Sequence, residues 1–69
     1  MNDSLKDLLR QQIMGIYYKF EDKKSLPRSA RRRLDTLYKD YRAQDGNSYI
    51  TEYYEEMCRW EIYEDGKIV

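Results

Sequence analysis

The chain has 69 residues, and its 13 basic and 13 acidic side chains give a formal net charge of zero. This length allows one small domain, residues 1–69, and the neutral charge is unlike the basic excess typical of nucleic-acid-binding domains. One cysteine and no histidine exclude an intrachain disulfide and a Cys/His metal site, and they favour a reducing, cytoplasmic setting. Charged residues interrupt the apolar ones near the N-terminus, so we expect neither a signal peptide nor a membrane span.

The first predicted helix covers residues 3–21. Asn2, Asp3 or Ser4 can cap its first amides. Its inner face has apolar residues at three- and four-residue steps: Leu5, Leu8, Leu9, Ile13, Ile16, Tyr17 and Phe20. Gly15 lies within this helix at a cost of about 1 kcal/mol relative to alanine, so we expect close approach of another helix there, or a bend.

The second predicted helix covers residues 27–44. Pro27 suits its first turn, because the amide that proline lacks would be unpaired there. The expected inner face consists of Ala30, Leu34, Leu37, Tyr38 and Tyr41. Gly46 is the expected left-handed residue that ends this helix.

The third predicted helix covers residues 48–60, with Asn47 or Ser48 as its cap. The residues expected to face inward are Ile50, Tyr53, Tyr54 and Met57. The segment Trp60–Tyr63 can either continue this helix or start an extended tail. Its alternating β-favouring residues and the Asp65-Gly66 turn signal that follows favour a short extended tail, which can form a minimal hairpin. So few residues join the second and third helices that these must be antiparallel or steeply crossed. The expected fold class is all-α, a three-helix domain with a short extended C-terminal tail.

The charge is distributed unevenly along the chain. Residues 1–43 carry eleven basic and six acidic side chains, a balance of +5, whereas residues 44–69 carry two basic and seven acidic ones, a balance of −5. This asymmetry is the strongest electrostatic feature of the sequence.

Part of the second and third predicted helices resembles a short module of small accessory proteins of tailed bacteriophages. The module reads LYxxYxxxxGNxxIxxxYxxM, and its counterpart runs from Leu37 to Met57 within a similar stretch of about residues 26–62. Asp45 stands where the module usually has a second glycine. The resemblance implies phage origin, a bacterial host cytoplasm and an accessory role, and it implies no reaction.

The acidic third helix and the tail provide the first candidate site. The residues predicted to contact a partner protein are Glu52, Tyr53, Tyr54, Glu55, Glu56, Trp60 and Tyr63. Aromatic side chains that cannot all face one small core are good interface anchors, because they bury much area at low entropic cost. The alternative is that the rings edge the core and the carboxylates only solvate the helix. A further hypothesis is that the acidic face mimics nucleic acid in the basic groove of a host protein.

An arginine cluster at the start of the second helix provides the second candidate site: Arg28, Arg31, Arg32 and Arg33. Such a cluster can neutralise phosphates, since the planar guanidinium group matches them. Positive charge is unfavourable at a helix N-terminus, which hints at a use for it. Three interpretations stay open: a solvated face or internal salt bridges to the third helix, a second contact with a protein partner, and nucleic-acid binding.

We find no catalytic, cofactor or metal motif in the sequence, and we predict that the protein is not an enzyme. The preferred hypothesis is a protein-binding accessory or inhibitor factor that docks on a larger host or phage protein. The alternatives are a nucleic-acid-binding regulator that uses the arginine cluster and a self-assembling oligomer whose apolar seam is completed between copies.

Overall fold

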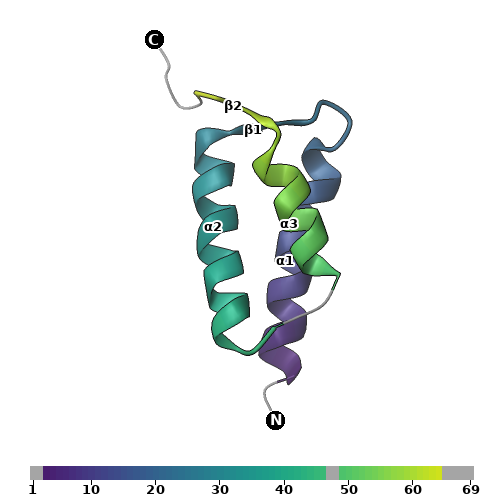
Figure 1. The fold of residues 1–69 in the computed structure, drawn as a ribbon, viewed down its shortest axis with the longest axis vertical. Coiled ribbons are helices and arrows are strands. Elements are labelled where there is room, and N and C mark those ends of the chain that lie inside the picture. The colour runs from purple at the N-terminus through teal and green to yellow at the C-terminus, as the bar shows by residue number, and fades with distance from the viewer. Residues whose placement is uncertain (1–2, 47–48, 65–69) are drawn as a thin grey trace.

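The computed structural model of the protein describes residues 3–46 and 49–64, and Figure 1 shows how its elements are arranged. The elements in chain order are α1 (Asp3–Phe20), β1 (Ser25–Pro27), α2 (Arg28–Ala43), α3 (Ile50–Cys58) and β2 (Glu61–Tyr63). The prediction of a mostly helical three-helix domain is confirmed, with each helix slightly shorter than expected. The expected caps Asn2, Asn47 and Ser48, and the expected Asp65–Gly66 turn, lie outside the described residues.

The two strands form a parallel pair that the sequence analysis did not predict. Ser25 pairs with Glu61, Leu26 with Ile62 and Pro27 with Tyr63. The extended tail was therefore predicted correctly over Glu61–Tyr63, and its strand partner among the described residues is β1, which lies before α2. A label of all-α misses this sheet, because three-residue strands are too short to show a periodic pattern.

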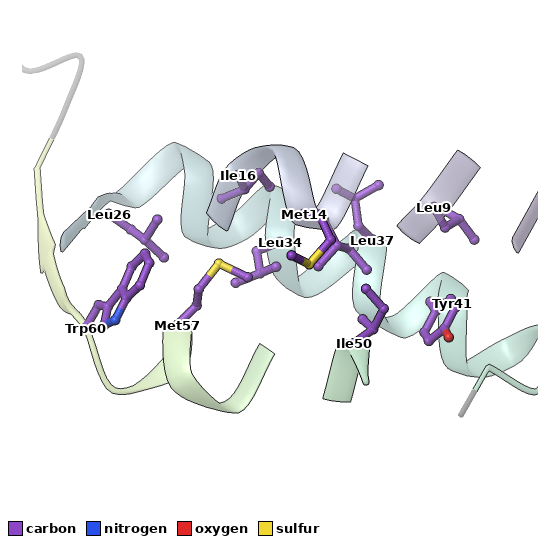
Figure 2. Close-up of a cluster of buried hydrophobic side chains, with 11 residues drawn as sticks. Leu9, Met14, Ile16, Leu26, Leu34, Leu37, Tyr41, Ile50, Met57 and Trp60 are labelled. Carbon is purple, nitrogen blue, oxygen red and sulfur yellow. The ribbon is translucent and has the colours of Figure 1, made fainter. Parts of the chain in front are cut away.

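The core is one continuous cluster that runs along the inner faces of the three helices (Figure 2). Its buried members are Leu9, Ile13, Met14, Ile16, Leu26, Leu34, Leu37, Tyr41, Ile50, Met57 and Trp60. Trp60 and Leu26 lie at one end of the cluster, and Tyr41 and Leu9 lie at the other. The expected inner faces of α2 and α3 are confirmed, with Tyr38, Tyr53 and Tyr54 half-buried at their edges.

The inner face of α1 differs from the predicted one. Leu5 and Leu8 are 42% and 49% exposed, whereas Met14, which was not predicted to be inside, is buried. Met14 lies on the same side of α1 as Tyr18, four residues later, and both side chains lie near Tyr49 at the start of α3. The buried face of α1 is therefore the side that α3 covers, which includes Met14. The two leucines are not covered, because α3 is short.

The C-terminus of α2 is closed by a Schellman motif. The amide of Gly46 donates to the carbonyl oxygen of Tyr41 at 3.0 Å, and the amide of Asp45 donates to that of Arg42 at 2.9 Å. The residue with positive φ is Asp45, at 66°, and not Gly46 as predicted. Asp tolerates this conformation, and Gly46 is required instead by packing, because a Cβ there would lie 2.6 Å from the ring and carbonyl oxygen of Tyr41.

Pro27 and Gly15 also differ from their predicted roles. Pro27 is the extended residue just before α2, with φ −67° and ψ 153°, since it also ends β1. A Cβ at Gly15 would meet no heavy atom within 4 Å among the described residues, so no helix of this chain approaches closely there.

The two glycines should respond in opposite ways to alanine. Gly46→Ala should lower the free energy of unfolding by about 1–3 kcal/mol, because the added methyl group must displace buried Tyr41. Gly15→Ala, the control, should raise it by up to about 1 kcal/mol, because alanine favours the helix and its methyl group meets open space. Urea denaturation measures both changes, and equal effects of the two substitutions would contradict the packing role of Gly46.

Candidate partner-binding surface

Aromatic rings hold α3 against α1. The ring of Tyr17 in α1 stacks on Trp60 with centroids 5.4 Å apart, and it meets Tyr53 edge-on at 4.7 Å. Tyr53 in turn meets Tyr49 edge-on at 5.9 Å. These rings bury apolar area and gain from edge-to-face geometry, so they fix one side of α3.

A second aromatic contact holds α3 against α2. Tyr38 and Tyr54 stack with centroids 3.9 Å apart and planes 5° from parallel. The hydroxyl groups of Tyr38 and Thr51 are 3.0 Å apart and share a hydrogen bond. The backbones of α2 and α3 are less closely packed on each other than each is on α1. Tyrosine side chains fill the space between α2 and α3.

A polar network continues from Tyr54. Its hydroxyl group donates to Oδ1 of Asp35 at 2.9 Å, and Nε of Arg31 donates to the same oxygen at 3.1 Å. Burial raises the pKa of Tyr54, and the nearby Cys58 and Asp35 raise it further. The phenol therefore stays protonated at neutral pH and serves as a structural donor.

These contacts account for three of the predicted partner residues. Trp60 is 7% exposed and belongs to the core, so little of its ring is accessible to a partner of the folded chain. Its ring stacks on Tyr17 and lies next to Leu26 at one end of the core (Figure 2). Tyr53 and Tyr54 are half-buried, with their rings already packed on Tyr17 and Tyr38.

The outer side chains of α3 and β2 form what we call the α3–β2 surface: Tyr49, Glu52, Glu55, Glu61 and Tyr63. Tyr49 and Tyr63 are 55% and 45% exposed, and the three glutamates are exposed. Among residues 3–46 and 49–64, these glutamates form no ion pair. The predicted contacts Glu52, Glu55 and Tyr63 thus lie on this surface.

Sequence reasoning left Tyr49 and Glu61 out of the predicted contact set. Tyr49 immediately precedes α3 and lies outside the inner stripe that starts at Ile50. Its exposure could have been predicted from this position. The remaining predicted residue, Glu56, is half-buried and pairs with Lys24 at 3.7 Å.

The arginine cluster is largely engaged within the chain. Arg28 pairs with Glu64 at 2.7 Å, one position beyond the strand pairing. Arg31 pairs with Asp35 in the same helix, and Nη2 of Arg33 donates to Oε1 of Gln12 in α1 at 3.0 Å. Internal salt bridges were one of the open interpretations, but the pairs are made with the tail and α2, and not with α3. Arg32 is exposed, and no ion pair or hydrogen bond involves it within the described part of the chain.

Neither a metal site nor a membrane helix is found in the described ranges. No group of three or more Asp, Glu, Cys or His side chains is placed there to hold a metal ion. Over the same ranges, none of the helices has the length and apolar character needed to cross a bilayer.

The chain matches no family model, no curated protein and no solved structure in the comparisons with known proteins.

The hydrogen bond of Tyr54 should contribute to stability. Tyr54→Phe keeps the ring stack but removes the donor to Asp35, so the free energy of unfolding should fall by about 0.5–1.5 kcal/mol. Tyr18→Phe is the matched control, because Tyr18 is 62% exposed and its hydroxyl group can bond to water. Urea denaturation of both variants and the wild type tests this, and equal stability of all three proteins would contradict the role of the bond.

Stability should also decrease at alkaline pH through Tyr54. Its pKa is raised in the folded state above the ordinary value of 10.0, so the folded chain holds this proton more tightly than the unfolded chain. The contribution is complete below pH 10 and is lost as the pH rises through the folded pKa. Unfolding midpoints between about pH 8 and pH 11 should therefore fall less steeply in Tyr54→Phe than in the wild type. Parallel slopes would refute this assignment.

Proposed function

We propose that the protein is a non-enzymatic binding factor that docks through the α3–β2 surface on a basic surface of a larger protein. The observation that supports this proposal most directly is the set of exposed carboxylates Glu52, Glu55 and Glu61, which have no cationic partner in the described parts of the chain. Carboxylates of this kind attract a basic surface and orient it during encounter.

The exposed rings supply the apolar part of such an interface. Tyr49 lies at the start of α3, and Tyr63 lies on β2, so the two tyrosines are at opposite ends of the acidic side chains of the helix. Tyrosine is enriched in binding hot spots because its ring buries a large area and its hydroxyl group can still hydrogen-bond.

The rigidity of α3 supports the same proposal. Tyr17 and Tyr38 hold the two sides of the helix, so its outer glutamates keep fixed positions relative to β2. A surface that is ordered before binding loses less conformational entropy when the partner docks. The likeness to phage accessory proteins adds that the partner is a host or phage protein and that the factor acts on it as an accessory or inhibitor.

The alternative of nucleic-acid binding has less support from the contacts. Three of the four clustered arginines already bond to Glu64, Asp35 or Gln12, so phosphates would have to compete with these groups. To bind phosphates, these arginines would first have to break their bonds to Glu64, Asp35 and Gln12.

Capture from nuclease-treated bacterial lysate with matched variants tests the proposal. The wild type should retain one protein in stoichiometric amount, and rising salt should release it. Glu55→Lys should reduce its capture by at least about tenfold, because the substitution places a cation opposite a basic partner. Asp22→Lys is the control, since Asp22 is an exposed carboxylate in the turn before β1 and its charge changes equally.

A second pair of variants tests the apolar contacts. Tyr63→Ala should weaken capture, whereas Tyr18→Ala, at a ring that is exposed on α1, should not. Equal capture by all variants would place the interface elsewhere. If the protein captures only nucleic acid, and only without nuclease, the arginine cluster becomes the binding site and this proposal is wrong.

A further inference from the structure

A face formed by α1 and α2, on the side away from α3, carries exposed leucines at one end and an open cavity at the other. Leu5 and Leu8 are among the exposed large apolar residues of the described chain. The cavity has a volume of about 500 Å³, and the described residues that line it belong to α1, β1 and α2 or to their junctions. Its floor includes Ile16, Phe20 and Ala30, and Gly15 leaves it open above α1.

The leucines and the cavity lie on one stripe of α1. Leu5, Gln12 and Lys19 are spaced by seven residues, as are Leu8 and Gly15, and residues seven apart lie on nearly the same side of a helix. Gln12 is midway along this stripe. The exposed leucines therefore precede Gln12 by four and seven residues, and the cavity residues Ile16 and Lys19 follow it by the same numbers.

We propose that this α1–α2 face joins two copies of the chain about a two-fold axis at Gln12, with the two α1 helices antiparallel. Such an axis exchanges positions that are equally far from Gln12. Leu8 of one copy meets Ile16 of the other and enters the cavity that Gly15 leaves open. Leu5 reaches the apolar stem of Lys19, whose ammonium group is 5.5 Å from the Phe20 ring centroid.

The charges on the two helices agree with this register. Arg33 of α2 donates a hydrogen bond to Gln12, so these two residues lie at the same level of the face. Asp40 lies seven residues after Arg33 in α2, and Lys19 lies seven residues after Gln12 in α1. Because α1 and α2 run in opposite directions (Figure 1), Asp40 lies near the leucine end of the face. The two-fold axis then brings Asp40 to the level of Lys19 in the other copy, about 10 Å from Gln12 along the helices. In the parts of the chain that the structure describes, neither side chain has an ion pair of its own.

The outline of the face is smaller than a standard interface, so the dimer must use all of it. A stable interface takes about 800 Å² from each partner, which is about one sixth of the 4867 Å² accessible surface. The 18 residues of α1 are about 27 Å long and two adjacent helices are about 20 Å wide, so the flat outline of the face is about 540 Å². Two such faces total about 1,080 Å², the size of a weak and reversible interface. The dimer thus requires the leucines and the cavity together, and neither end is large enough alone.

Salt distinguishes this dimer from one made by opposite charges. The axis brings the two copies of Arg33 to the same level, where they repel each other at low salt. Screening weakens this repulsion and the two Asp40–Lys19 attractions alike, so the dimer should depend little on salt. Docking of the acidic α3 of one copy on the Lys19 and Arg33 edge of another would weaken with salt.

Sedimentation of the full chain over a range of concentrations is the first test. The wild type should form a dimer, and Leu8→Asp should raise its dissociation constant by at least about 100-fold, because the residue occurs twice in the interface. Tyr18→Asp is the control, since Tyr18 is exposed on another side of the same helix. A wild type that stays monomeric at all concentrations, or equal effects of the two substitutions, would overturn the proposal.

A cross-link at the axis tests the register directly. With Cys58 replaced by serine, Gln12→Cys should form a disulfide-linked dimer on mild oxidation, because the axis brings the two residues together. Gln11→Cys, one position away on another side of α1, should cross-link at least about tenfold more slowly. Equal rates for the two cysteines would overturn the proposed axis even if a dimer sediments.

Discussion

The structure depends on how a helix of nine residues is held in place. α3 fully buries only Ile50 and Met57, and a helix of this length has little stability alone. Its position is set by rings on both sides, Tyr17 with Tyr53 toward α1 and Tyr38 with Tyr54 toward α2. Tyrosine suits this role because its ring packs on the core while its hydroxyl group reaches water or a polar partner at the edge.

This use of tyrosine explains which parts of the candidate site could be predicted. Helical spacing placed Tyr53 and Tyr54 on the inner side of the third helix, and both rings pack against the core while staying half-buried. The same spacing cannot tell whether a half-buried ring packs within the chain or awaits a partner, because both need an edge position. The burial of Trp60 was not predicted, because it depends on where the chain leaves α3, and helical spacing does not show that point.

The fold was predictable where the signal was periodic and local. The three helices and the inner face of α2 follow from apolar spacing, and the sharp turn after α2 follows from the Asp45–Gly46 sequence. The parallel strand pair was not predictable, since it joins two three-residue segments that are distant in sequence. The exposure of Leu5 and Leu8 depends on the limited reach of α3, a tertiary property that the α1 sequence does not contain.

The pairing of β1 with β2 has a consequence for the order of folding. The strands are separated by α2 and α3, so their hydrogen bonds close a long loop, and the entropy of closure is recovered only after both helices have docked. The α1–α2 pair requires shorter-range contacts and can form early. β2 should therefore be among the last segments to join during folding and among the first to detach during native-state opening, which makes its amides fast to exchange with deuterium.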